Sequence, residues 1–343
     1  MALFLGLLIF SFIITSILVV PFINLLYKLR FLRQEQVTKD FLGLRAKIFD
    51  RLHQHKAGTP VGGGLLIIAA VGILYAILFP LVSFWGVYVT AVYPIQEELN
   101  ILFFSFISFG LLGLYDDLKK FFGFKQTGFF GLRLRHKFLI QWLLAFIIAA
   151  LLYWNLGIDF INIPFLGIVN LGKWYIPFAA FVIVAFANAF NITDGLDGLA
   201  CGLLMICLFA FWIISASILD TTLSVFLSLW IGSLIAFLYF NIYPARIWLG
   251  DVGALSFGAT LAVVGLLLGK IMALLIIGGF FIVEAGSSLI QILSKRFLKR
   301  RAFTVAPFHL WLQNKNWEEP KIVMRAWLVG IMLALFGLWL AVI

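Results

Sequence analysis

Polar residues recur every three positions in the segment NAFNITDGLDGLA, which spans residues 188–200 and follows a long apolar run. Asn188, Asn191, Asp194 and Asp197 supply amide and carboxylate oxygens, the donors that hard cations such as Mg²⁺ prefer. Steps of three keep side chains on one broad face of a helix. The spacing therefore predicts one lining of a metal and phosphate site. A helix N-cap at Thr193 or Asp194 is the alternative, but a cap explains only one of the acids.

A second polar group, YDDLKK, ends another apolar run at residues 115–120. Neighbouring helical residues point about 100° apart, so Asp116 and Asp117 are expected to have separate roles, such as metal contact and proton handling. Lys120 and Lys137 add positive charge nearby. The alternative is a solvated helix end beside a basic loop.

Two further clusters contain glycines that permit close backbone approach. The segment HKAGTPVGGG (55–64) offers Lys56 and Thr59 as phosphate contacts, or is a flexible turn before a helix. The segment NIYPARIWLGDVGA (241–254) places Asp251 just ahead of an apolar run. Asp251 is either a functional acid or a helix cap.

The last cluster is the basic, aromatic loop 295–320, which contains His309. Its alternative interpretation is an amphipathic segment bound to anionic lipid. Glu284 lies inside the apolar run before this loop, where a charge costs about 2.5–3.5 kcal/mol on insertion scales. We expect Glu284 to face the interior of the helix bundle.

The elements that must position these clusters are membrane-spanning helices. The chain of 343 residues is 64% hydrophobic and only 12% charged, and its apolar runs reach the roughly 20 residues that cross a bilayer. A spanning chain must satisfy its own backbone hydrogen bonds, which favours helices. The sequence predicts an all-α polytopic membrane protein, a single domain over 1–343, with about ten spans: 2–27, 62–82, 99–115, 138–155, 174–191, 198–217, 222–240, 253–269, 271–293 and 322–342.

Basic residues are distributed unevenly between the two sets of loops. The main loops of one side are 28–61, 116–137, 188–197, 241–252 and 294–321. With the last loop extended to residue 325, these loops hold all Lys and Arg residues except Lys173 and Lys270. This asymmetry predicts that they are cytoplasmic, that both termini are outside, and that the chemistry takes place on the cytoplasmic face. The net charge of +10 is thereby explained without nucleic-acid binding.

The polar clusters all fall at helix ends on that one face. A transporter would place them near the middle of the membrane, on broken helices. Mg²⁺ needs only one or two carboxylates when substrate phosphates complete its shell. The pattern therefore indicates Mg²⁺-dependent phosphoryl chemistry. Cys201 and Cys207 lie in an apolar run, and we expect them to be buried apolar residues.

From about residue 50 to the C-terminus the chain resembles the polyprenyl-phosphate N-acetylhexosamine-1-phosphate transferase superfamily. HKAGTPVGGG, YDDLKK, NAFNITDGLDGLA and NIYPARIWLGDVGA match its motifs in order. The GTP of the first motif and the tail WEEPKIVMRAW (317–327) resemble the phospho-N-acetylmuramoyl-pentapeptide transferase branch.

The resemblance implies a reaction and a place in the cell. UDP-MurNAc-pentapeptide and undecaprenyl phosphate would react to give lipid I and UMP, with Mg²⁺ as cofactor, for peptidoglycan synthesis. The enzyme would be a multi-pass protein of the bacterial inner membrane, in contact with membrane lipids. Whether it forms a homodimer is open.

The resemblance also implies residue roles. Catalytic roles fall on Asp116, Asp117, Asp251 and His309, and metal contacts on Asp251, Asp194 and Asp117. Substrate-binding roles fall on Lys56, Thr59, Lys120, Lys137, Asn188, Asn191, Asp194, Asp197, Asn241 and Gln291.

The chain departs from the family pattern around His309. PFHLWLQ carries Leu310, Trp311 and Gln313 where the family has further histidines and a glutamate, and Ala254 replaces a serine. A sister enzyme that moves GlcNAc-1-phosphate or another HexNAc-1-phosphate is therefore a second hypothesis. A non-catalytic binder or transporter is a third, although the retained aspartates argue against it.

Overall fold

The computed structural model describes residues 1–33, 56, 58–84, 89–122 and 134–343. Most of the predicted loop 28–61 and part of the loop 116–137 lie outside these residues.

The described chain is almost entirely helical. Its elements are α1 (Ala2–Lys28), α3 (Gly63–Phe84), α4 (Ile95–Phe122), α5 (Leu134–Trp154), β1 (Phe160–Ile163), β2 (Gly167–Asn170), η2 (Gly172–Trp174), α6 (Tyr175–Thr193), α7 (Leu199–Ser217), α8 (Thr221–Asn241), α9 (Gly250–Leu267), α10 (Ile271–Ile277), α11 (Gly279–Phe297), α12 (Phe308–Asn314) and α13 (Glu319–Val342). Among them, nine helices are long and apolar enough to cross a membrane, or ten if α10 and α11 form one span. The predicted fold class and span count are confirmed.

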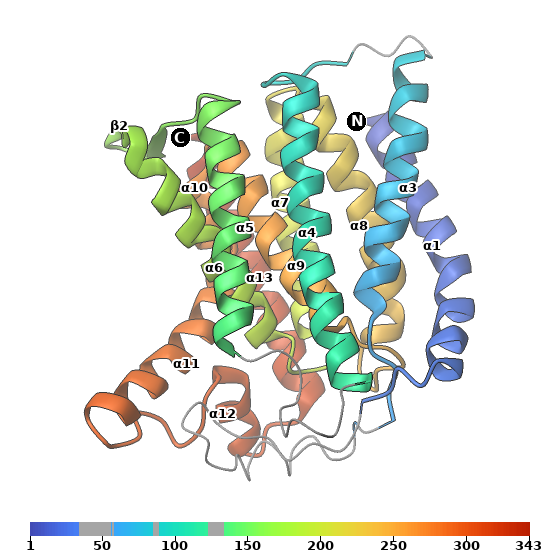
Figure 1. The fold of residues 1–343 in the computed structure, drawn as a ribbon, viewed down its shortest axis with the longest axis vertical. Helices are drawn as coiled ribbons and strands as arrows, with labels where there is room; N and C mark the ends of the chain where they lie inside the picture. Colours follow the sequence, from blue (N-terminus) through green and yellow to red (C-terminus); the bar gives the residue numbers. More distant parts are fainter. Residues whose placement is uncertain (34–55, 57, 85–88, 123–133) are drawn as a thin grey trace.

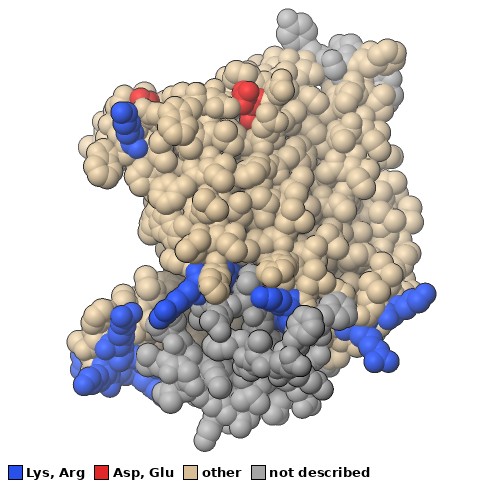
Figure 2. Space-filling view, viewed as in Figure 1, with Lys and Arg blue, Asp and Glu red and all other residues tan. Residues whose placement is uncertain are grey.

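The long helices form a bundle in which α8 and α9 are the most deeply buried and α1 and α5 the least (Figure 1). Both chain termini lie at one end of the bundle, and α12 lies at the other end (Figure 1). Lys and Arg side chains gather around the α12 end, whereas the middle of the molecule is nearly free of charge (Figure 2). This distribution is the one expected for a protein whose middle lies in hydrocarbon.

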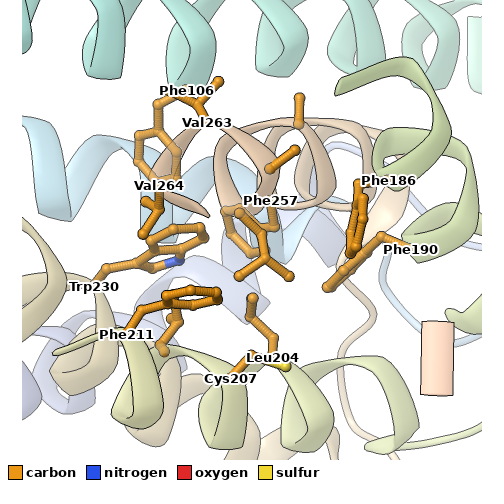
Figure 3. Close-up of a cluster of buried hydrophobic side chains, with 14 of the residues drawn as sticks. Phe106, Phe186, Phe190, Leu204, Cys207, Phe211, Trp230, Phe257, Val263 and Val264 are labelled. Carbon is orange, nitrogen blue, oxygen red and sulfur yellow. The ribbon is translucent and has the colours of Figure 1, made fainter. Parts of the chain in front are cut away.

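Aromatic side chains from several helices meet in the core (Figure 3). Phe257 of α9 lies 5.4 Å from Trp230 of α8 and 5.7 Å from Phe106 of α4, measured between ring centroids. Phe190 of α6 approaches the same ring edge-on at 6.3 Å. Offset and edge-to-face pairs of this kind favour one mutual orientation of the helices. The core thereby fixes where the polar ends of α4, α6, α8 and α9 meet.

Two close backbone contacts bring helix ends together near the polar clusters. A Cβ atom added at Gly113 of α4 would overlap the main-chain carbonyl of Asp251, at the start of α9. A Cβ atom added at Gly64 of α3 would overlap Gly253 of α9. The glycines therefore let α3 and α4 pack directly against the first turn of α9.

The predicted ninth span, 271–293, is not a straight helix. It is divided into α10 and α11 at Gly278 and Gly279, with a bend of 74°, and a glycine pair is a recognised cause of such a break. Beyond the bend, α11 leaves the bundle at an angle (Figure 1). The antiparallel hairpin β1–β2 in the predicted outer loop was also not anticipated.

Several helices continue into segments that were predicted as loops. α4 runs to Phe122, α6 to Thr193 and α11 to Phe297, and α12 lies inside the predicted loop 294–321. Asp116 and Asp117 are therefore helical residues. Polar residues within a helix's last turns mark its approach to water, not its end.

Candidate active site

Five charged residues from three helices meet at the α12 end of the bundle and form the aspartate–lysine cluster: Asp116, Asp117, Lys120, Lys137 and Asp251. The ammonium of Lys120 lies 2.8 Å from Asp251 and 3.3 Å from Asp116. The ammonium of Lys137, at the start of α5, donates to Asp116 at 2.9 Å and also to Asp251. Asp251 Oδ2 thus accepts from both lysines, and each lysine joins α4 to α9.

The two adjacent aspartates, for which the sequence predicts separate roles, have different environments. Asp116 contacts both lysines of the cluster. Asp117 is 2% exposed, and its Oδ2 accepts a hydrogen bond from the Val252 backbone N–H at 3.1 Å. That N–H belongs to the first turn of α9, where backbone donors have no partner within the helix. Asp117 therefore fixes α9 against α4.

Asp251 is not a helix cap. It lies in the first turn of α9, whose N-cap is Leu249, and makes no side-chain cap hydrogen bond. Its carboxylate is near the positive end of the helix dipole, which favours an anion. The cap alternative for Asp251 is wrong. Its side chain instead pairs with Lys120 and Lys137.

The segment NAFNITDGLDGLA does not lie on one helical face. α6 ends at Thr193, and residues 194–198 form a turn before α7. The Thr193 hydroxyl donates to the carbonyl of Ala189, and α7 has no side-chain cap, so the cap alternative is wrong here too. The three-residue repeat spans a helix end and a turn, and Asp194 and Asp197 belong to the turn.

The helical half of this segment is partly engaged elsewhere. Asn188 Nδ2 donates to Gln141 Oε1 of α5 and to the carbonyl of Val184, both at 2.8 Å. Asn191 is half-buried. Gln141 is 1% exposed, and its contribution was not predicted because a single polar residue in an apolar span carries no pattern. The Asn188–Gln141 pair joins α5 to α6.

Asp194 is half-buried beside the aspartate–lysine cluster. Desolvation and the nearby negative charge of Asp251 together raise the pKa of Asp194 to about 7, although the Arg33 guanidinium opposes the rise. A cation placed among these carboxylates would favour their charged forms.

A second charged group, the Lys56 triad, consists of Lys56, Asp197 and Glu319. The Lys56 ammonium lies 2.9 Å from Asp197 Oδ1 and 2.5 Å from Glu319 Oε1. Glu319 Oε1 also accepts from the Asp197 backbone N–H at 2.6 Å. Asp197 Oδ2 accepts from the Ala245 backbone N–H at 2.9 Å. The triad therefore joins Lys56 of the HKAGTPVGGG segment to the 194–198 turn and to the last helix.

Glu319 and Arg33 were not among the predicted site residues. Glu319 lies in the first turn of α13, and its signal was an acid beside proline just before an apolar run. Arg33 follows α1; its guanidinium lies 4.6 Å from the ring centre of Trp248, and the Lys56 ammonium lies 4.8 Å from the same ring. Trp248 thus has two cations against its ring.

Thr59 and Asn241 lie close to these groups along the chain. The Thr59 carbonyl accepts from the Arg33 backbone N–H at 2.9 Å. Asn241 is 2% exposed; its Nδ2 donates to the carbonyl of Ile247, while its Oδ1 is buried with no partner among the described residues. A buried acceptor without a donor is costly, so Asn241 offers an oxygen to a ligand.

His309 and Glu284 form a buried pair. His309 Nδ1 lies 2.9 Å from Glu284 Oε2, and the two side chains are 2% and 0% exposed. Glu284 faces the interior, as predicted. Gln291 exchanges two hydrogen bonds with the backbone of Phe303, so in this structure it supports the loop after α11.

The described residues contain no group of three Asp, Glu, His or Cys side chains placed to hold a metal ion together. The metal contacts suggested for Asp251, Asp194 and Asp117 therefore remain a prediction. Mg²⁺ with few protein ligands fits the donors present, because Asp251, its neighbouring aspartates and the free Oδ1 of Asn241 are all hard oxygens.

The chain is similar to known glycosyl transferases. The family model of glycosyl transferase family 4 matches residues 99–269. A protein of Caldanaerobacter subterraneus subsp. tengcongensis named phospho-N-acetylmuramoyl-pentapeptide-transferase is 36% identical over 83% of this chain and 85% of its own length. Proteins of the same name from Chloroflexus aggregans and Borrelia turicatae are 38% and 34% identical, over 85% and 96% of this chain and 79% and 92% of their own lengths.

Proposed function

The chain belongs to the phospho-N-acetylmuramoyl-pentapeptide-transferase family, whose members are phosphoglycosyl transferases, and we propose that it transfers phospho-MurNAc-pentapeptide from UDP-MurNAc-pentapeptide to undecaprenyl phosphate. An oxygen of the lipid phosphate forms a bond to the sugar-bearing phosphorus. The bond from that phosphorus to UMP breaks, and lipid I and UMP are the products. The names of the relatives support the sugar substrate.

The aspartate–lysine cluster is the observation that carries this proposal. Both substrates are phosphate anions, so their approach is opposed by charge repulsion that Lys120 and Lys137 can reduce. A phosphate monoester has a second pKa near 6 and is mostly dianionic at neutral pH. The lipid phosphate therefore needs little help from a base. Positioning and charge neutralisation are the larger contributions.

Mg²⁺ would be held by Asp251 with Asp117 or Asp194, and when bound it would neutralise charge that develops on the diphosphate. Lys120 and Lys137, which contact Asp251 Oδ2 in this structure, would turn to the phosphates of the substrates. Asp116 would hold Lys137 in place and take any proton that the lipid phosphate retains. Asn241 Oδ1 would accept a hydrogen bond from the nucleotide.

The chain is a multi-pass membrane protein, and its place is proposed to be the bacterial inner membrane with the site on the cytoplasmic face. The gathering of Lys and Arg at the α12 end supports this orientation (Figure 2). Homodimer formation stays a prediction that no observation here tests.

Measurement of UMP release tests the proposal. Purified protein is given undecaprenyl phosphate and Mg²⁺ together with either UDP-MurNAc-pentapeptide or UDP-GlcNAc. We expect release with the first nucleotide sugar and loss of release on chelation. Release with UDP-GlcNAc alone would contradict the muramoyl assignment, and release that persists under chelation would contradict the metal.

The sister activity, transfer of GlcNAc-1-phosphate, remains a second candidate because of the residues around His309. Leu310 is buried, Trp311 stacks on Phe308, and Gln313 has a buried Oε1 with no partner among the described residues. These side chains offer a more apolar surface beside the histidine than the family pattern does. UDP-GlcNAc in the same assay separates the two activities.

A further inference from the structure

Glu284 is a fully buried acid in α11, and its carboxylate contacts His309. Its Oε1 and Oε2 lie 3.1 and 3.4 Å from the backbone nitrogen of His309, and Oε2 lies 2.9 Å from Nδ1 of the same residue. Burying a carboxylate is costly unless it gains strong partners. Its partners are the backbone N–H and the Nδ1 group of His309. Glu284 therefore positions His309.

The backbone contact fixes the start of α12. His309 is the second residue of this seven-residue helix, and its N–H is one of those that a helix leaves without an internal partner. Glu284 satisfies it from α11. The position of the His309 backbone is therefore set by the same carboxylate that holds its ring.

The ring contact decides which nitrogen of His309 carries a proton. A buried carboxylate 2.9 Å from Nδ1 requires an N–H at that atom. Nε2 is then the other end of the ring, and in the neutral form it is a hydrogen-bond acceptor. The hydrogen bond made by one ring nitrogen thus sets the chemistry of the other.

Nε2 faces the turn between α6 and α7. A Cβ atom added at Gly195 would lie 2.5 Å from His309 Nε2. Gly195 separates Asp194 from the Lys56 triad residue Asp197 in the sequence. The imidazole therefore meets the 194–198 turn at a point where any larger residue would push it away.

We propose that Glu284 is a positioning residue that holds His309 with Nδ1 protonated, so that Nε2 is presented beside the 194–198 turn to accept a hydrogen bond from an O–H or N–H group of the nucleotide sugar. The role of the acceptor rests on the proposed function. The orientation of the ring does not. Glu284 acts through His309, and touches no reacting atom.

Nitrogen NMR of the histidines tests the orientation without any assay of activity. The chain has four histidines, and protein with ¹⁵N-labelled histidine in lipid bilayers gives resolved signals for Nδ1–H and Nε2–H forms. The His309 signal is assigned by its loss in His309→Ala. We expect an Nδ1–H signal in the unsubstituted protein. An Nε2–H signal for His309 in the unsubstituted protein would overturn the proposal.

Glu284→Gln sharpens the test. The amide oxygen of glutamine can still accept from the His309 backbone, while its NH₂ group donates to Nδ1 and so favours the Nε2–H form. We expect the His309 signal to change accordingly. An unchanged tautomer in folded Glu284→Gln would show that the carboxylate does not set it.

A double-mutant cycle separates positioning from general structure. We expect Glu284→Gln to lower kcat/KM roughly 10- to 100-fold, the range found when a functional histidine loses its carboxylate partner. In the His309→Ala background the same change is expected to cost less than about twofold, because its effect passes through His309. An equal cost in both backgrounds would overturn the proposal. Glu318→Gln, an exposed acid next to Glu319, is the matched control.

The two proposals fail in different ways. If the unsubstituted protein releases no UMP from any nucleotide sugar while His309 shows the Nδ1–H form, the proposed function fails and the positioning role of Glu284 stands. If turnover is normal and the ring is Nε2–H, the positioning role fails alone.

Discussion

The aspartate–lysine cluster and the Lys56 triad lie at the same end of the bundle, yet they differ in access to solvent. In the first, the side chains of Lys120 and Asp251 are 24% and 14% exposed. In the second, those of Lys56 and Asp197 are 3% and 5% exposed. Each group joins charged residues from segments far apart in the sequence, and in each the carboxylates outnumber the lysines by one.

The difference between the two groups is in what satisfies the carboxylates. Backbone N–H groups of Asp197 and Ala245 complete the triad, so its members have fixed partners, as a buried ion pair requires. In the aspartate–lysine cluster one oxygen of Asp251 accepts from two lysines, an arrangement that can change when anions arrive. The aspartate–lysine cluster is therefore suited to chemistry, and the Lys56 triad to holding the site together.

Of all the variants, Asp251→Ala is expected to lower turnover the most. It removes the carboxylate that both lysines share, and we expect UMP release to fall at least about a thousandfold, the scale at which charge-handling groups act in phosphoryl transfer. The melting temperature should change little, because Asp251 is partly exposed. UMP release and thermal unfolding measure the two effects.

Near-normal turnover in Asp251→Ala would show that the aspartate–lysine cluster, like the Lys56 triad, is not needed for the chemistry. Asp159→Asn, in the segment before the β1–β2 hairpin at the opposite end, is the control and should leave turnover unchanged.

Lys56→Met is expected to have the largest effect on stability. It leaves Asp197 and Glu319 buried against each other without the ammonium that both contact, and breaking a buried pair in this way costs about 3–5 kcal/mol of unfolding free energy. Reversible unfolding in mixed detergent micelles measures the loss. Lys119 is an exposed lysine of α4, and Lys119→Met, the control, should lower the unfolding free energy by less than about 1 kcal/mol. Equal losses in the two variants would show that the triad does not stabilise the fold.

Gly113→Ala tests the close contact that holds α4 beside α9. The added Cβ would overlap the Asp251 carbonyl, so the helices must separate, at about 1–3 kcal/mol of stability. We expect kcat to fall about 10- to 100-fold because Asp251 is displaced from Asp116. Gly110→Ala, one turn earlier, is the control. Its Cβ would overlap the Cδ1 tip of the Ile68 side chain, which can move, and would be in ordinary contact with Ser256, so the change should be nearly neutral in both measurements.

Glu319→Gln is expected to have the smallest effect. Glutamine keeps an oxygen for the Lys56 ammonium and the Asp197 N–H, while the triad becomes neutral. The unfolding free energy should change by no more than about 1 kcal/mol. A loss as large as that in Lys56→Met would mean that the charge of Glu319, and not its hydrogen bonds, holds the triad.

The sequence predicted the helices from composition and the cluster from motif order, because both depend on local residue types. It did not predict the contribution of Glu319 or Arg33, since each acts through a partner that is distant in the sequence. The three-residue repeat predicted one helical face, but α6 ends at Thr193, inside the repeat. The break at Gly278 was hidden by the apolar residues on both sides of it.

The Lys56 triad also orders events during synthesis. Lys56 and Asp197 leave the ribosome long before Glu319, which opens the last helix, α13. Until that helix is inserted, Lys56 and the Asp197 backbone N–H lack the carboxylate that they share. Lys56 and the 194–198 turn therefore gain their full set of contacts only when the chain is nearly complete. A truncated product that stops before α13 cannot complete the site.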